Sequence, residues 1–333
     1  MPLIVRTRRT AVSDDWSVTE RALTPHIAWA DRGHYLFASP VWAEALRSLG
    51  ATPVYAWSNL REVGVAIPVF QRVGFRVGFL GFPIMGEALD RMNPHELEAL
   101  IERVLQKGRL NLVRIARGNQ SRSIKTVDSA RPDVWIDDLS AWAGGNRRVR
   151  RDLAFAKRAA SRLEIVDGLI NPDGCFALYV ATVSAHGGTA KYSIDYFRRL
   201  ASLATRVPTI KAYSAVDEFG LTRAFAVMGR HGGWGYYLHS AADDATKRKG
   251  IGDLLLSRLI EHARSLGCKS FSFMASPWGQ PGLIKFKQKW GNSIGLTTTI
   301  HVGYGFKAVG LKAFSRWQLR HDRRAGMDWM QSR

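Results

Sequence analysis

The stretch that decides the fold runs over residues 236–273 and reads YYLHSAADDATKRKGIGDLLLSRLIEHARSLGCKSFSF. It starts in an aromatic strand predicted over 234–240, and a loop rich in Ala, Asp and Lys follows. From Gly250 onward, apolar residues recur at helical spacing until Gly267 ends the helix. A second strand is predicted over 268–276. The order is therefore strand, basic glycine loop, helix and strand.

The flanking segments continue this alternation of strands and helices. Asp217 to Gly220 is typical of a tight turn, and Ser193 is a good helix N-cap. Strands are predicted over 209–216, 222–230 and 293–303, and helices over 173–186, 193–204 and 281–290.

The N-terminal third also predicts a mixed α/β unit. Ser39 and Pro40 begin a helix that Gly50 ends, and Asn93 and Pro94 begin another. Strands are predicted over 52–58, 63–70, 73–82 and 110–117, with a further strand running into a turn at 135–138.

Composition bounds the function classes. The 333 residues are enough for about two domains. Lys and Arg number 48 against 28 acidic residues, and the net charge of +20 predicts an anionic partner. No apolar run is long enough to predict a membrane span. No apolar segment follows the N-terminal arginines, so no secretory signal is predicted. Cys175 and Cys268 are the two cysteines, too few for a disulfide framework, which predicts a reducing cytoplasm. The spacing of the histidines predicts no metal site.

Two basic segments are candidates for anion binding. Residues 146–163 form a helix on which Arg147, Arg151 and Arg158 share one face, and a solvated surface helix is the alternative. The second segment joins three cations to a helix N-terminus, where glycines let the backbone approach a phosphate. This predicted pyrophosphate site comprises Lys247, Arg248, Lys249, Gly250, Ile251 and Gly252.

Three stretches together resemble the acyl-CoA N-acyltransferase (GNAT) superfamily, and within it the FemAB-like and BioF2-like branch. They are the basic helix and short strand at 144–168, the loop and helix of 236–273, and GLIKFKQKWGN at 282–292. The third is similar to the branch's F-K-x-x-F/W-G motif. Lys247 stands where the family's pyrophosphate loop has Gln or Arg. The likeness covers about residues 135–295.

The resemblance implies an α/β fold, a mixed sheet made of two fused GNAT-like domains, with the first degenerate. The expected boundaries are 1–140 for the degenerate domain, 141–304 for the acyl-donor domain and 305–333 for a basic tail. It also implies acyl-CoA as co-substrate, no metal and a bacterial-type cytoplasmic enzyme.

The motif at 282–292 supplies the candidate catalytic residue. Lys287 matches the family lysine credited with stabilising the oxyanion that develops during acyl transfer. Trp290 lies one turn further along, so we expect the Lys287 ammonium near its indole ring. Lys285 and Lys289 point elsewhere on the helix. A charged surface helix is the alternative.

The acyl groove is predicted at the ends of the two strands. Ser276 is expected to hydrogen-bond the donor, although the residues around it also fit a plain turn. Tyr237 and His239 are expected on one strand face, opposite Tyr236, and His239 also fits a core histidine. We identify no general acid. The predicted substrate contacts are Arg147, Arg151, Tyr237, His239, Trp278, Gln280 and Trp290.

The tail predicts an amphipathic basic helix. Its apolar side carries Leu311, Phe314 and Trp317, and its basic stripe carries Lys312, Arg316 and Arg320. Such a helix docks on an anionic membrane surface or nucleic acid, or packs its apolar side on the body.

Three functions remain open from the sequence. The first is an N-acyltransferase that moves an acyl group from acyl-CoA to an amine of a small molecule such as an amino acid, of a sugar nucleotide or of a cell-envelope precursor. The second is a FemAB-like aminoacyltransferase that uses aminoacyl-tRNA, which the charge of +20 favours. The third is a non-catalytic module that binds nucleic acid or a membrane. The expected location is cytoplasmic, with the inner membrane face as a possible docking surface.

Overall fold

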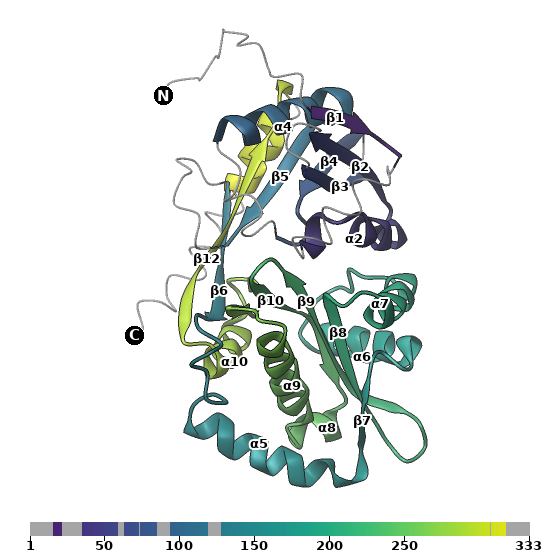
Figure 1. Ribbon diagram of the computed structural model, residues 1–333, viewed down its shortest axis with the longest axis vertical. Coiled ribbons are helices and arrows are strands. Elements are labelled where there is room, and N and C mark those ends of the chain that lie inside the picture. Colours follow the sequence, from purple (N-terminus) through teal and green to yellow (C-terminus); the bar gives the residue numbers. More distant parts are fainter. Residues whose placement is uncertain are drawn as a thin grey trace.

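A single mixed sheet of twelve strands runs through the computed structural model, with helices packed on it in two tiers (Figure 1). The structure describes residues 16–21, 35–58, 63–72, 74–84, 94–118, 128–306 and 308–317. Asn93 and residues 318–333 of the predicted tail, including Arg320, lie outside this part. The strand order is β1-β2-β3-β4-β5-β12-β6-β11-β10-β9-β8-β7. The predicted mixed α/β sheet is confirmed.

The N-terminal half contributes five consecutive strands of the sheet. The face of α4 that carries Leu100 and Val104 is buried against them, as the helical spacing of its apolar residues requires. Its elements are β1 (Trp16–Thr19), η1 (Leu36–Ala38), α2 (Pro40–Ala45), η2 (Leu46–Leu49), β2 (Ala51–Ser58), β3 (Val63–Arg72), β4 (Phe75–Leu80), α4 (Pro94–Lys107) and β5 (Leu112–Arg117).

The C-terminal half repeats this plan with more helices. Its long helix α9 buries Ile251, Leu255 and Leu259 on the sheet, as predicted. Its elements are α5 (Arg147–Ala159), η3 (Ala160–Arg162), β7 (Glu164–Asp167), α6 (Pro172–Ala185), α7 (Ile194–Arg206), β8 (Ile210–Val216), β9 (Thr222–His231), β10 (Trp234–Ala242), α8 (Asp244–Arg248), α9 (Ile251–Ser265), β11 (Ser270–Ser272) and α10 (Pro281–Trp290).

Each half contains one parallel strand pair among antiparallel neighbours. In the first half β4 runs parallel to β5, and α4 connects them. In the second half β10 runs parallel to β11, and α8 and α9 connect them. A parallel pair needs such a crossover, so the two halves share one topological unit.

The last strand of each half pairs with the other half. The strand β6 (Ser129–Ile136) follows β5 in the chain but pairs with β11, and β12 (Ser293–Val302) follows α10 but pairs with β5. β12 also pairs with β6 along 293–299. This exchange makes the sheet continuous, whereas the domain boundaries at 140 and 304 remain predictions.

Two strands differ in length from their predicted bounds. The strand predicted over 268–276 ends at Ser272, because Met274 has a left-handed backbone with φ of 63° that a strand cannot continue. The strand predicted from 135 begins at Ser129. Pro132 concealed it, since proline argues against a sheet interior.

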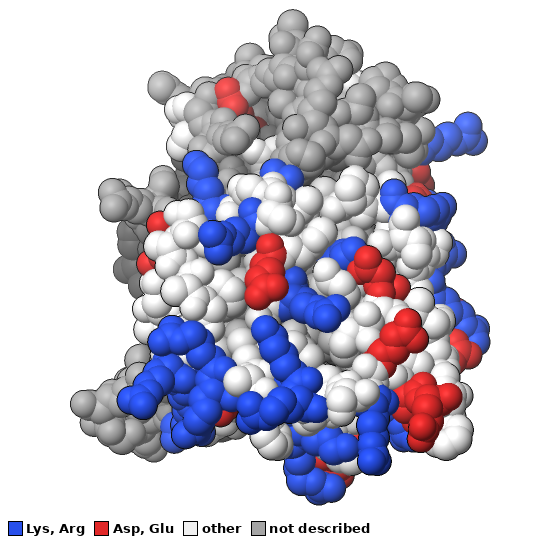
Figure 2. Space-filling view, turned by 60° about the horizontal axis from the view of Figure 1, so that its bottom comes forward, with Lys and Arg blue, Asp and Glu red and all other residues white. Residues whose placement is uncertain are grey.

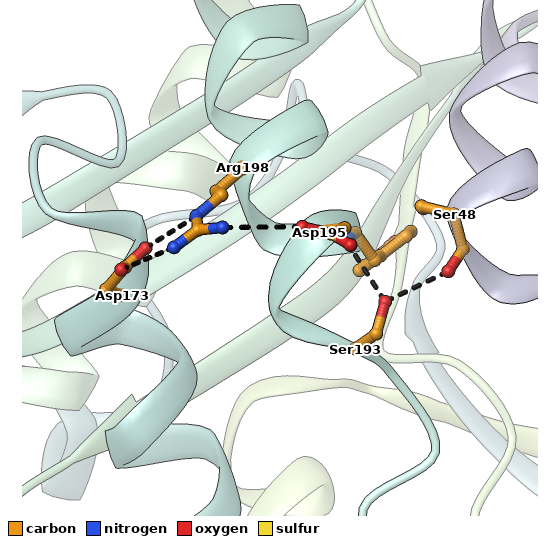
Figure 3. A network of polar contacts seen from close by, with 6 residues as sticks. Ser48, Asp173, Ser193, Asp195 and Arg198 are labelled. Carbon is orange, nitrogen blue, oxygen red and sulfur yellow. Dashed lines mark hydrogen bonds and ion pairs between the residues drawn. The ribbon is translucent and has the colours of Figure 1, made fainter.

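Contacts outside the sheet also join the halves. The backbone N–H of Phe37 donates to Nδ1 of buried His231 at 2.9 Å, and the two rings stack. Figure 3 shows a second junction, where Oγ of Ser193 at the start of α7 donates to the carbonyl of Ser48 at 3.0 Å. Beside it, Arg198 of α7 binds Asp173 of α6 through two hydrogen bonds. These contacts fix α6 and α7 near the first half.

Candidate active site

The candidate site begins where the parallel strands β10 and β11 separate. Their pairing ends at Tyr236 and Ser272. Beyond Ser272 the backbone leaves β10 and runs alongside β6. Phe273 N–H donates to the Val134 carbonyl at 2.9 Å, and Ser276 N–H donates to the Pro132 carbonyl at 2.8 Å. A split at the carboxyl ends of parallel strands is a common ligand position.

Lys287 projects from α10 to the end of β11. It is 5% exposed, and its Nζ donates to the Met274 carbonyl at 2.5 Å. The left-handed backbone of Met274 turns that carbonyl out of the strand pattern. Burial lowers the pKa of Lys287 to about 8, against an opposing effect from the Asp133 carboxylate. The predicted catalytic lysine is therefore a buried ammonium at the split, and not a member of a charged surface helix.

The donor loop begins at the short helix α8. Lys249 follows this helix, and Gly250 has φ of 72°, a conformation that favours glycine. Gly252 has open space where a Cβ would lie. The side chain of Ile251 is fully buried. Only its backbone N–H, at the N-terminus of α9, is left to contact a ligand.

A pocket of about 470 Å³ lies between this loop and the basic helix α5. Arg151 and Arg158 reach it from α5, so the structure brings together two basic segments that lie about 90 residues apart. Arg147 does not line it. The residues that line the pocket are Arg151, Asp152, Phe155, Arg158, Lys247, Arg248, Gly250 and Asp253.

The two carboxylates in the pocket wall both pair with a single lysine of α10, Lys289. Nζ of Lys289 lies 3.0 Å from Asp152 Oδ2 and 2.8 Å from Asp253 Oδ2. The hydrogen bond from Lys289 lowers the pKa of Asp152. The arginines and lysines of the pocket thus leave a positive potential for an anion.

One sequence expectation about α10 is wrong. The cation near the Trp290 ring is Lys289, 5.8 Å from the ring centroid, because the Lys287 ammonium is drawn inward to the Met274 carbonyl. Lys289 faces another direction than Lys287, as expected, and joins α10 to α5 and α9 at the donor pocket. Trp290 is buried and stacks on Trp142, which makes it a core residue.

The expectation that Tyr237 and His239 share a strand face is also wrong. A β-bulge lies between them, since Tyr237 pairs with Met228 and His239 with the adjacent Val227. Tyr237 packs on Phe273 on the α9 side. His239 points instead to the helices α6 and α7.

Aromatic rings from α6, α7 and the loop between them surround His239. Tyr192 contacts it edge to face at 4.6 Å, and Tyr179 and Phe197 lie within 6.4 Å. Its Nε2 shares a hydrogen bond of 2.9 Å with the Tyr196 hydroxyl. Burial lowers the pKa of His239 to about 4, which makes it neutral at pH 7. The imidazole is therefore a neutral ring in a core position, with one protonated and one unprotonated nitrogen.

The segment after β11 contains the remaining predicted contacts. Ser276 is 1% exposed, and within the described part of the chain its Oγ has no hydrogen-bond partner. Trp278 is buried with its Nε1 donating to the Ala130 carbonyl at 2.9 Å, so its indole N–H is already used. Gln280 caps the start of α10 and is half-buried.

Residues 145–287, which hold most of this site, match the family model of the acetyltransferase (GNAT) domain. This segment is a GNAT domain. The acyltransferase prediction is therefore confirmed, and the predicted resemblance to the superfamily is confirmed over residues 145–287. A search of curated proteins finds no match to the chain.

Solved structures share the fold over both halves. FemX has a TM-score of 0.61 at 11% identity, over 85% of this chain and 96% of that chain. A conserved protein of unknown function from Bacteroides thetaiotaomicron has a TM-score of 0.53 at 14% identity, over 85% and 98%. The predicted arrangement of two fused GNAT-like halves is confirmed. The BioF2-like assignment remains a prediction.

Sequence reasoning missed Asp133 and the aromatic rings around His239. Asp133 is a carboxylate inside the strand β6, and a charged residue directly before the apolar run Val134–Ile136 was the available signal. In the GNAT domain and the rest of the described chain, no three His, Cys, Asp or Glu residues cluster as metal ligands. None of the described helices is long and apolar enough to cross a membrane.

Proposed function

We propose that the chain is a bacterial N-acyltransferase that moves an acyl group from acyl-CoA to an amine of a small molecule, a sugar nucleotide or a cell-envelope precursor. The observation that carries this proposal is the pocket of about 470 Å³ between α5 and the N-terminus of α9. It combines a helix N-terminus with four cationic side chains, as a pyrophosphate requires.

The proposed roles follow from where each group lies. Lys247, Arg248 and the backbone N–H groups of Ile251 and Gly252 would bind the donor's phosphates, with Lys249 exposed beside them. The amine attacks the thioester carbonyl, a C–N bond forms, the C–S bond breaks, and the leaving thiolate takes up the proton that the amine loses. Lys287 would stabilise the oxygen that becomes negative, and Ser276 would hydrogen-bond the donor.

Acceptor binding is proposed along β10, whose Tyr237 faces the α9 side and whose His239 faces α6 and α7. Tyr237, Trp278, Gln280 and the α5 arginines were predicted as substrate contacts, and these roles remain proposals. His239 is neutral, and its unprotonated nitrogen can accept a hydrogen bond from the N–H of an amine. Its Nε2 shares a hydrogen bond with the Tyr196 hydroxyl. The two cysteines are buried thiols that are not joined in a disulfide, which suits the proposed cytoplasmic location.

A second candidate is aminoacyl transfer from aminoacyl-tRNA. Figure 2 shows the face at the lower end of Figure 1, where Lys and Arg side chains gather over a broad area. This area is larger than a CoA pyrophosphate needs and fits a polyanion. Its exposed cations on α5 and α8 include Arg147, Arg148, Arg150, Arg151, Lys157, Arg158, Lys247 and Arg248.

Thermal unfolding separates the two donors. A ligand that binds only the native state raises the midpoint, by about 2.7 kcal/mol of added stability at 100 times its Kd. We expect acetyl-CoA to raise the midpoint by several degrees and desulfo-CoA to act alike, with little change between 50 and 200 mM salt, because few phosphates are bound. A midpoint raised only by tRNA, and lost steeply as salt increases, would replace CoA by aminoacyl-tRNA as the donor.

We also propose that the C-terminal helix docks on an anionic membrane surface. Residues 308–317 are helical, and Ala308 and Arg316 hold the helix to the body, with Arg316 Nε donating to Asp128 Oδ1 at 2.7 Å. Phe314 and Trp317 are 58% and 60% exposed, so the alternative that this apolar side packs on the body is wrong for them. Residues 305–324 contain six Lys or Arg and one Asp. Exposed aromatic residues among cations suit a lipid interface.

Vesicle sedimentation tests this docking. The protein should sediment with phosphatidylglycerol vesicles, and the double substitution Phe314→Ser and Trp317→Ser should lower the partition constant about 100-fold or more, since each buried ring contributes roughly 1.5–3 kcal/mol. The matched control is Phe219→Ser with Leu221→Ser, which removes two exposed apolar side chains from the turn after β8. Equal losses in both double variants would exclude a specific role for the helix.

A further inference from the structure

Asp133 is a buried carboxylate at the centre of the exchanged strands. It lies on β6 and is 5% exposed. Oγ1 of Thr297 on β12 donates to its Oδ2 at 2.7 Å, and Oγ of Ser272 on β11 donates to its Oδ1 at 3.1 Å. The carboxylate therefore joins three adjacent strands. None of the roles proposed above uses it.

The serine extends this network to the backbone of Met274. Ser272 Oγ accepts a hydrogen bond from the Met274 N–H at 3.0 Å. The Ser272 hydroxyl has a single proton, which it donates in the hydrogen bond to the Asp133 carboxylate. The lone pairs of its oxygen are therefore directed to the Met274 N–H. Asp133 thus orients the hydroxyl that holds the left-handed residue in place.

The carbonyl of Met274 completes the network at Lys287. It accepts the hydrogen bond from the ammonium at 2.5 Å. Both backbone polar groups of Met274 are thus held, the N–H by Ser272 and the carbonyl by Lys287. Three hydrogen bonds connect the carboxylate of β6 with the ammonium of α10.

The charges of the two ends also act on each other. Burial lowers the pKa of Lys287 to about 8, and the Asp133 carboxylate opposes that change. Burial raises the pKa of Asp133, and the hydrogen bond from Thr297 and the Lys287 charge oppose it. Each group favours the charged form of the other, as expected of opposite charges in a dry interior.

Other charged groups around α10 are occupied elsewhere. Lys285 is exposed to solvent. Lys289 binds Asp152 of α5 and Asp253 of α9. On β12, the neighbour of Asp133 is the Thr297 hydroxyl. Among the described residues, Asp133 is the charged group shown to act on the Lys287 ammonium.

We propose that Asp133 is a positioning residue, which acts through Ser272 and Met274 to hold the Lys287 side chain at the strand split in its protonated form. The proposal rests on the role of Lys287 in the proposed function. It requires no contact between Asp133 and either substrate.

The test measures the protonation of Lys287 directly as well as turnover. The lysine Cε–Nζ signals are titrated by NMR in the wild-type protein and in Asp133→Asn, with Lys287→Met to assign the signal. We expect Asp133→Asn to lower the pKa of Lys287 by about one unit or more, since the nearby negative charge is lost. The ammonium loses its proton as pH rises, so the high-pH limb of kcat should move to lower pH by the same amount, with the donor KM unchanged.

Two further variants complete the experiment. Asp128→Asn is the matched control, because Asp128 is an equally buried carboxylate beside β6 that binds His301 and Arg316. It should leave the Lys287 titration unchanged. Ser272→Ala keeps both charges and removes the hydrogen bond to Met274, so kcat should fall about tenfold, the cost of one hydrogen bond, while the ammonium titrates near its wild-type pH.

The NMR titration keeps this proposal distinct from the proposed function. An unchanged Lys287 titration in Asp133→Asn would overturn it, and so would wild-type kcat in Ser272→Ala. If Asp133→Asn does not fold, the Ser272→Ala result decides. If no acyl transfer is found at all, the shift of the Lys287 pKa still supports or refutes the coupling, and only the catalytic role of Lys287 is lost.

Discussion

Lys287→Met is expected to lower kcat about 100- to 1000-fold while changing the donor KM little, since removal of one oxyanion donor typically has this cost. The negative oxygen exists only in the transition state, so the ground state gains little from the ammonium. Methionine has a similar length without charge, which limits the cavity that an alanine would leave. Thiol release from acetyl-CoA with an accepted amine measures the rate, and kcat should also fall above a pH of about 8 as the wild-type ammonium loses its proton.

Lys285→Met is the matched control, because it removes an exposed lysine from the same helix. It should retain wild-type kcat. Lys289 is unsuitable as a second control, since its loss would leave Asp152 and Asp253 unpaired at the donor pocket. If Lys287→Met and Lys285→Met both changed kcat by the same small amount, the role assigned to Lys287 would be wrong.

Gly252→Val is expected to weaken CoA binding at least tenfold, measured by calorimetry. A Cβ at Gly252 meets nothing within 4 Å, so the fold tolerates the side chain. The added methyl groups would instead occupy the space in front of the α9 N-terminus, where phosphate oxygens need to approach the N–H groups. Gly250 is a poorer choice, because its φ of 72° would strain any other residue and mix binding with stability.

Gly310→Val provides the comparison for Gly252→Val. Gly310 is also helical with nothing near its Cβ position, and it lies outside the pocket. Its variant should bind CoA as tightly as the wild type, and both variants should unfold within a few degrees of it. Wild-type CoA affinity in Gly252→Val would show that the α9 N-terminus does not receive the donor.

Local patterns were enough to predict most of the second half. The period of apolar residues gave the strands at 222–230 and 234–240 and the helix from Gly250, because each has one buried face. The glycine loop was found for the same reason, since its backbone requirement is local. The link between that loop and the Arg158 face of α5 depends on tertiary packing, which periodicity does not contain.

Errors in the site arose where one residue departs from the regular element. The bulge after Tyr237 moved His239 to the opposite face, since one extra residue reverses the alternation of a strand. Met274 ended β11 early and drew Lys287 inward. Asp133 was missed because its partners, Ser272 and Thr297, come from strands about 140 and 160 residues away.

The exchange of β6 and β12 has a consequence for how the protein is made. β5 gains its neighbour β12 only from residues 298–302, near the C-terminal end of the sequence. A ribosome that has released the first 290 residues leaves the edges of β5 and β6 unpaired, and such edges are sites of aggregation. The sheet of the N-terminal half is therefore completed only after residues 298–302 have left the ribosome.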